Sequence, residues 1–195
     1  MLNEVFKWVA DKVAKSCLVG KLYKNNDDPE GLVELINKFL DMQTKIIINN
    51  KGTIDKYMGD CIMAFWNAPL DCKDHAELAV KSALEVLDAT QKLNEELSPL
   101  NLPPINVGIG ISTGECIVGN MGSEIRFDYS VIGDAVNLGA RLEGQTRNYD
   151  GVDLLLSERT YHLCPSRAFK EIDKILVKGK SEKVRIYTPL ETNPT

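Results

Sequence analysis

Asn137 and Arg141 are the residues whose types and spacing point most directly to chemistry. They lie four apart in a stretch, residues 134–146, that we expect to be helical, and residues four apart share one face of a helix. A guanidinium forms paired hydrogen bonds to phosphate oxygens, and an amide can pair with hydroxyl groups. The two side chains together therefore suit a ribose and a phosphate.

A second stretch, residues 52–66, carries Lys56 and Asp60. We expect strands at residues 53–58 and 61–66, and the two-residue Gly59-Asp60 connection between them is typical of a tight hairpin. Asp60 would then lie at or beside the hairpin tip. Taken alone, the stretch is most simply an amphipathic hairpin with both charges solvated, but the Asn137 and Arg141 pair in the same chain favours a joint site.

Residues 52–66 and 127–143 together resemble the two signature blocks of the class III nucleotide cyclase catalytic domain in its bacterial form. The resemblance extends over residues 28–190. It implies a ferredoxin-like α+β fold that works as a dimer. It also implies conversion of ATP to cyclic AMP and pyrophosphate, with two Mg²⁺ or Mn²⁺ ions bound at the dimer interface.

The resemblance assigns metal and base recognition to three residues. Asp60 matches one of the two metal-binding aspartates. Lys56 and Ser130 match the pair that recognises the purine, and a lysine there resembles the adenylate-specific pattern, whereas guanylate-specific relatives usually carry glutamate and cysteine. The chemistry agrees, because a lysine can donate to adenine N1 but meets a protonated N1 in guanine.

Three further residues match the family's ribose and phosphate contacts. Asn137 matches the residue that orients the ribose, Arg141 the one that stabilises the transition state, and Lys178 the one that holds the terminal phosphates. Attack of the ribose 3′-hydroxyl on the α-phosphorus requires removal of its proton and neutralisation of charge on the phosphoryl oxygens and on pyrophosphate. A metal pair and fixed cations can meet that requirement.

One family motif is missing. The first strand normally carries Phe-x-Asp-Ile-x-Gly-Phe about a dozen residues before the Pro-Glu that opens the first helix, but residues 14–26 contain no carboxylate. Counting back from Pro29 reaches Ser16, which cannot replace a carboxylate on Mg²⁺. We therefore expect the first strand to be degenerate or replaced, and one metal aspartate to be absent.

This departure leaves alternatives to an adenylate cyclase. The chain could be a truncated or rearranged cyclase, a degenerate subunit that complements an intact partner, or a regulator that binds nucleotide without turnover. A guanylate cyclase is a weaker alternative. The expected partners are accordingly ATP and a second cyclase domain, in a homodimer or a heterodimer.

The remaining pattern predicts the elements that position these residues. We expect helices at 28–48 and 73–97 and a short one after residue 157, with strands at 105–112, 115–119, 126–132 and 152–156 and a closing hairpin of 169–177 and 183–188. Turns are expected at 113–114 and 120–123. These elements fit a sandwich with helices on one face of a largely antiparallel sheet. Gly108 and Gly110, inside a strand, would border a nucleotide or a helix.

We divide the chain into an atypical segment at 1–27, the cyclase domain at 28–190 and a tail at 191–195. Val5, Trp8, Val9 and Val13 recur at helical spacing, which predicts a short amphipathic helix. Alternatively, residues 15–23 form a substitute first strand.

Composition limits the remaining functions. The 195 residues fit one domain, and 23 basic against 28 acidic residues, a net charge of −5, argue against nucleic acid as a partner. Five widely spaced cysteines form neither a disulfide framework nor a zinc site, so we expect reduced thiols in a cytoplasmic protein. Contact with a membrane is expected only through upstream segments that this sequence does not contain.

Overall fold

The computed structural model describes residues 6–13, 29–100, 102–176 and 182–190. Its described strands form one sheet in the order β2-β3-β1-β4-β6-β8-β7, with β5 paired to β4. The strands are β1 (Phe6–Val13), β2 (Thr53–Met58), β3 (Cys61–Phe65), β4 (Ile109–Gly122), β5 (Phe127–Ile132), β6 (Leu154–Ser157), β7 (Phe169–Ile175) and β8 (Val184–Pro189). Among these pairings only β4 with β6 is parallel. The predicted α+β fold with a largely antiparallel sheet is confirmed.

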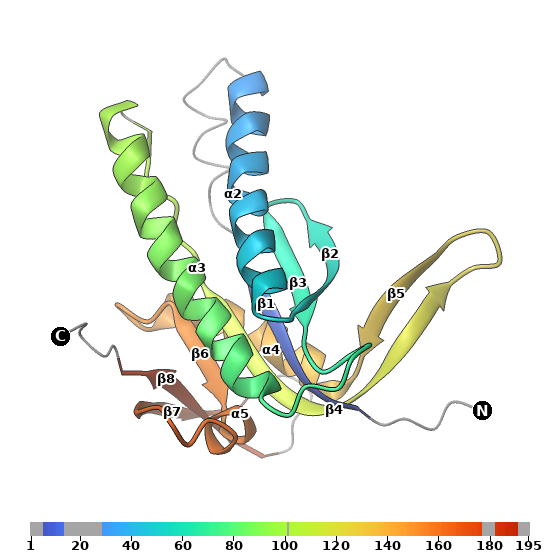
Figure 1. Ribbon diagram of the computed structural model, residues 1–195. Coiled ribbons are helices and arrows are strands. Elements are labelled where there is room, and N and C mark those ends of the chain that lie inside the picture. The colour runs from blue at the N-terminus through green and yellow to red at the C-terminus, as the bar shows by residue number, and fades with distance from the viewer. Residues whose placement is uncertain (1–5, 14–28, 101, 177–181, 191–195) are drawn as a thin grey trace.

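The helices cover both faces of this sheet rather than the one face predicted. Figure 1 shows α2 (Pro29–Asn49) and α3 (His75–Leu97) side by side over one face. Leu154 and Leu156 of β6 pack into the cluster that α2 and α3 cover, whereas Leu155 packs with Leu142 of α4 (Asp134–Gln145). Because successive side chains of a strand point to opposite faces, α4 lies on the other face. A short α5 (Glu158–His162) follows β6.

The N-terminal element is a strand, β1, and not the predicted amphipathic helix. It pairs antiparallel with β4 from Phe6 opposite Cys116 to Val13 opposite Ile109, and antiparallel with β3 at its other edge. Aromatic and β-branched residues favour strands. A strand between β3 and β4 also provides hydrogen-bond partners for the backbone N–H and C=O groups of both. The alternative substitute strand at residues 15–23 lies outside the described residues.

β4 runs for 14 residues without the turn predicted at 113–114. A Cβ atom added at Gly114 would lie 2.6 Å from Cβ of Ala135, so this glycine makes room for the start of α4. Beyond it, the second half of β4 pairs with β5 in a hairpin that projects from the body of the molecule (Figure 1). We call residues 117–132 the arm.

Glycines also let α4 pack directly on β4. A Cβ atom at Gly110 would collide with the backbone of Gly139 and Glu143, and one at Gly108 would collide with the side chain of Thr146. Of the two neighbours expected for these glycines, the structure has the helix. The close approach determines the height of α4, and hence of Asn137 and Arg141, above the sheet.

Candidate active site

A β-bulge in β2 brings two successive charged residues together. Ile54 pairs with Ala64 and Lys56 with Met63, so Asp55 is an extra residue on its strand. In a regular strand Asp55 and Lys56 would point to opposite faces, but a bulge redirects the extra side chain. The Asp55 side chain is completely buried, whereas that of Lys56 is 43% exposed.

The Asp55 carboxylate is the centre of a network that joins β2 to β5. Its Oδ2 atom accepts from Ser130 Oγ at 2.8 Å and from the backbone N–H of Val131 at 3.1 Å. Lys56 Nζ lies 3.1 Å from Oδ1 and donates to Ser130 Oγ at 3.3 Å. Oδ1 has no hydrogen-bond partner among the described residues, so its contact with the ammonium is purely ionic.

Packing at the base of the arm holds this network in place. Val131 is buried in a cluster with Phe65 and Cys116, and the Tyr129 ring lies 6.2 Å from that of Phe65. Ser130 therefore emerges between two anchored residues and is itself buried. The structure thus brings together the two residues predicted to recognise the purine.

Asp60 lies in the turn between β2 and β3, as predicted from the Gly59-Asp60 pair. Gly59 has φ of 67°, a left-handed conformation that favours glycine, so the turn depends on this residue. Asp60 is 6% exposed, and Cys61 Sγ approaches its Oδ1 atom at 3.8 Å. Asp60 is therefore a buried carboxylate and not the solvated one of the simpler interpretation.

Asn137 and Arg141 both lie on α4, one turn apart as predicted. Asn137 is exposed, and Arg141 is half-buried. The Nη1 atom of Arg141 is buried without a hydrogen-bond partner in the described part of the chain. A buried charged donor without an acceptor is costly, so this geometry favours an anionic ligand at Arg141. Lys178 lies outside the described residues.

The residue that sequence reasoning missed is Asp55. Its signal was weak, because the strand pattern places Asp55 on the face opposite Lys56 and nothing local predicts the bulge. The hydrogen bonds to Ser130 and Val131, 75 and 76 residues away, become visible only in the folded chain.

Asp60 is the carboxylate that could hold a metal ion at the turn between β2 and β3. Mg²⁺ is commonly held by one or two carboxylates together with substrate phosphates, so Asp60 suits one such ion. Asp11, the carboxylate of β1, pairs with Ala64, four residues along β3 from Asp60 or about 13 Å. The backbone pairing therefore places residue 11 away from the Asp60 turn. Among the described residues no cluster of three or more His, Cys, Asp or Glu side chains could hold a metal.

The thiol of Cys116, which packs with Phe65 and Val131 at the base of the arm, is unsuited to nucleophilic chemistry. Burial raises the pKa of Cys116, a backbone hydrogen bond at Val136 lowers it and the charge of Asp134 raises it, and together they bring this pKa to about 11. At neutral pH the thiol is therefore protonated, and a protonated thiol is a poor nucleophile. This leaves the polar residues of β2, β5 and α4 as the chemically useful groups near this face.

The sequence matches the family described as adenylate and guanylate cyclase catalytic domain over residues 19–189. It is 40% identical over 169 residues to adenylate cyclase of Anabaena cylindrica and 32% identical over 160 residues to adenylate cyclase 1 of Rhizobium meliloti (strain 1021), in each case covering 82% of this chain. Its structure superposes on the adenylyl cyclase CyaB from P. aeruginosa with a TM-score of 0.87 and 30% identity, covering 97% of both chains.

The chain belongs to the adenylate and guanylate cyclase catalytic domain family. Enzymes of this family generally use Mg²⁺ or Mn²⁺. The chain spans 32% of the Anabaena protein and 24% of the Rhizobium protein. None of the described helices is sufficiently long and apolar to span a membrane.

Proposed function

We propose that this chain is an adenylate cyclase catalytic domain that converts ATP to cyclic AMP and pyrophosphate. The observation that carries the proposal is the contact between Lys56 Nζ and Ser130 Oγ at 3.3 Å. It places a cationic donor beside a hydroxyl oxygen, and adenine offers the complementary pair, an N1 acceptor and an N6 amino donor. The names of the Anabaena and Rhizobium relatives support the same nucleotide.

In this proposal Lys56 donates to adenine N1 and Ser130 lies at the exocyclic amino group. Asn137 orients the ribose so that its 3′-hydroxyl faces the α-phosphorus. Arg141, whose buried Nη1 lacks an acceptor in the described structure, donates to the phosphoryl oxygens as they gain charge. Lys178 binds the terminal phosphates of the leaving pyrophosphate.

Asp60 would hold a divalent cation, Mg²⁺ or Mn²⁺, together with the phosphates. Such a cation lowers the pKa of the attacking hydroxyl and neutralises phosphate charge. Family sites hold two ions, and the second aspartate has no counterpart among the described residues.

We further propose that the active form is a dimer formed through the arm. Ile117, Phe127, Tyr129 and Ile132 are all exposed apolar residues of the arm. Ile117 pairs with Ile132, so these two share one face of the hairpin, whereas Phe127 and Tyr129 lie on the other face. Exposed apolar side chains on both faces favour the arm as a protein interface. A second copy, or another cyclase domain, would cover it and contribute half of each site.

One observation favours a second candidate, a cyclase-like subunit that complements an intact partner. Residues 14–26, the region where the family's first strand carries its metal aspartate, contain no carboxylate. Such a chain would lend Lys56, Ser130 and Arg141 to a partner that carries both aspartates.

Cyclic AMP formation from ATP with Mn²⁺ or Mg²⁺ tests the first proposal. Asp60→Ala and Arg141→Ala should each reduce turnover about 100-fold or more, on the scale of losing one transition-state contact. Asp71→Ala and Arg159→Ala, which remove exposed charges elsewhere, should leave it unchanged. Equal turnover in all five proteins would contradict the site.

A wild-type chain that binds ATP without turnover would support the second candidate. It should then restore activity when it is mixed with an intact relative that lacks the arginine equivalent to Arg141. No rescue in that mixture would reject complementation.

A further inference from the structure

We infer that Asp55 sets the preference for adenine by fixing the direction of the Ser130 hydroxyl; this inference rests on the proposed adenylate cyclase function. A serine hydroxyl is normally ambivalent, because it can donate one hydrogen bond and accept two. Ser130 alone could therefore serve either the amino group of adenine or the O6 atom of guanine. Something must remove that ambiguity if Ser130 is to discriminate between them.

The Asp55 carboxylate removes the ambiguity in the direction of the Ser130 hydroxyl. A carboxylate can only accept, so the 2.8 Å contact between Ser130 Oγ and Asp55 Oδ2 requires the hydroxyl proton to point at Asp55. Hydrogen bonds to a carboxylate are about twice as strong as neutral ones, which holds the proton there. Ser130 then presents only lone pairs to a ligand.

The bulge makes this arrangement rigid. Oδ2 also accepts from the backbone N–H of Val131, and the Asp55 side chain is completely buried. Lys56 Nζ lies 3.1 Å from the other carboxylate oxygen, so the same residue positions the ammonium. Asp55 therefore does not need to touch the nucleotide, and acts as a positioning residue through its two neighbours.

The consequence is a fixed donor beside a fixed acceptor. With Lys56 at ring position 1 and Ser130 at position 6, adenine matches both groups. Guanine presents an N1–H to the lysine and the O6 acceptor to the serine oxygen, and it mismatches both. Without Asp55, the Ser130 hydroxyl could turn and donate to O6, which would remove one of the two mismatches.

Calorimetric titration with α,β-methylene-ATP and α,β-methylene-GTP tests this without requiring turnover, since the methylene bridge blocks loss of pyrophosphate. Asp55→Ala should lower the ratio of ATP to GTP affinity about fivefold or more, the scale of one hydrogen bond. In a Ser130→Ala background the same substitution should change the ratio little, because no hydroxyl remains to be oriented. A purely structural role would weaken both nucleotides equally.

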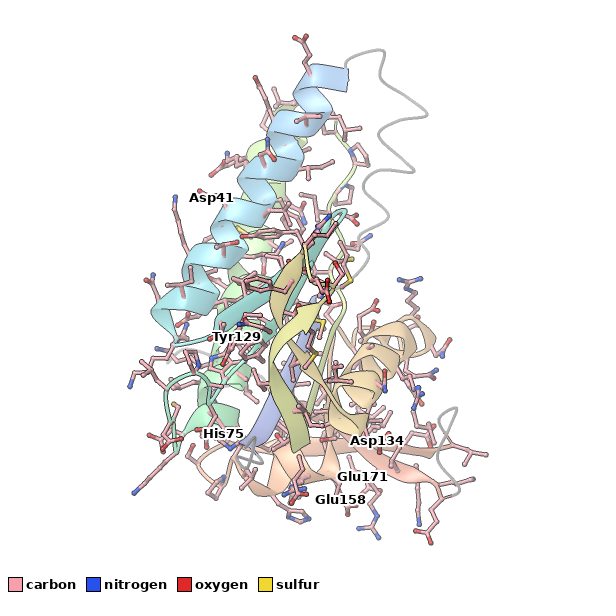
Figure 2. All side chains as sticks on the ribbon, turned by 90° about the vertical axis from the view of Figure 1, so that its right-hand side faces the viewer. Asp41, His75, Tyr129, Asp134, Glu158 and Glu171 are labelled. Carbon is pink, nitrogen blue, oxygen red and sulfur yellow. The ribbon has the colours of Figure 1, made fainter. Side chains whose placement is uncertain are left out.

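Asp41→Ala provides the matched control, because it also removes a carboxylate that is paired with a lysine, Lys45, at 2.6 Å. Figure 2 shows Asp41 on α2 well above Tyr129, the neighbour of Ser130, and its loss should leave the ratio unchanged. If Asp55→Ala does not fold, Asp55→Asn replaces it. Its neutral amide should give a smaller fall in the same direction.

An unchanged ratio in the Asp55 variant, or changes that add independently with Ser130→Ala, would overturn the inference while leaving the proposed function intact. If the wild-type chain binds neither nucleotide analogue, the proposed function fails, and the inference fails with it.

Discussion

Asp55 and Lys56 are consecutive residues of β2, yet their charged groups lie on the same side of the strand, with Nζ 3.1 Å from Oδ1. The bulge between Ile54 and Lys56 produces this relationship. It places a buried carboxylate behind two groups that would contact a purine. The site thus has a supporting residue whose effect on stability and on selectivity can be measured separately.

Loss of the Lys56 ammonium should destabilise the fold, because the carboxylate of Asp55 stays buried. Asp55 keeps its two hydrogen bonds, and Lys56 is partly exposed to solvent, so we expect Lys56→Ala to lower the free energy of unfolding by about 1–2 kcal/mol. Urea denaturation measures this. Lys45→Ala, which breaks an exposed ion pair with Asp41, should lower the free energy of unfolding by less than about 0.5 kcal/mol. Equal losses in the two variants would argue against a special role for the buried carboxylate.

Gly110 and Gly144 should respond to alanine with opposite signs. A methyl group at Gly110 would collide with the backbone of α4. Gly110→Ala should therefore lower the free energy of unfolding by about 2–3 kcal/mol and displace Asn137 and Arg141. Gly144 lies within α4 and has nothing within 4 Å of an added Cβ atom. Gly144→Ala should therefore raise the free energy of unfolding by about 0.5–1 kcal/mol, because alanine has the higher helix propensity. Thermal unfolding together with nucleotide binding checks both. A stable Gly110→Ala protein with normal binding would contradict the packing argument.

A charge on the arm should prevent dimer formation. Ile132 is exposed on β5, and we expect Ile132→Asp to raise the dimer dissociation constant at least about tenfold, the scale of losing one well-packed contact. Sedimentation velocity over a concentration series measures the change. Leu70→Asp is the control, since Leu70 is also apolar and exposed, at 80% against 59% for Ile132, but lies outside the arm. If both variants associate like the wild-type chain, the arm is not the interface.

The bond from Tyr149 Oη to Asp173 Oδ2, 2.8 Å long, should make stability depend on pH at both extremes. The hydrogen bond from Tyr149 lowers the pKa of Asp173, so its contribution is present above the ordinary carboxyl range and is lost as pH falls through the lowered value. Burial, followed by the bond to Asp173, raises the pKa of Tyr149 to about 12, so that contribution is lost as pH rises from 10 towards 12.

Tyr149→Phe should therefore be less stable than wild type at pH 7, and the difference should shrink both below pH 4 and above pH 10. Urea unfolding of the two proteins at pH 3, 7 and 11 measures it. A difference that is constant with pH would show that the lost hydroxyl matters for packing alone.

Local signals in the sequence were enough for a large part of the fold. The periodicity of α2 and α3 predicted both helices, because each buries one continuous apolar stripe. The Gly59-Asp60 pair predicted the turn, because Gly59 adopts a left-handed conformation that other residues resist. The spacing of Asn137 and Arg141 likewise placed them on one face of α4. Each of these properties depends on residues only a few positions apart.

Contacts between distant segments decided the rest. Residues 6–13 carry a helical spacing of apolar side chains, but as β1 they complete backbone pairing for both β3 and β4. Gly114 resembles a turn residue, and its role is instead set by Ala135 of α4. Asp55 gains its function from Ser130, 75 residues away. The sequence by itself determined most of the elements and the chemical types at the site. The tertiary structure decided that residues 6–13 form a strand, that β4 continues through Gly114 and which groups meet at the site, since hydrogen-bond partners and close packing are supplied by other parts of the chain.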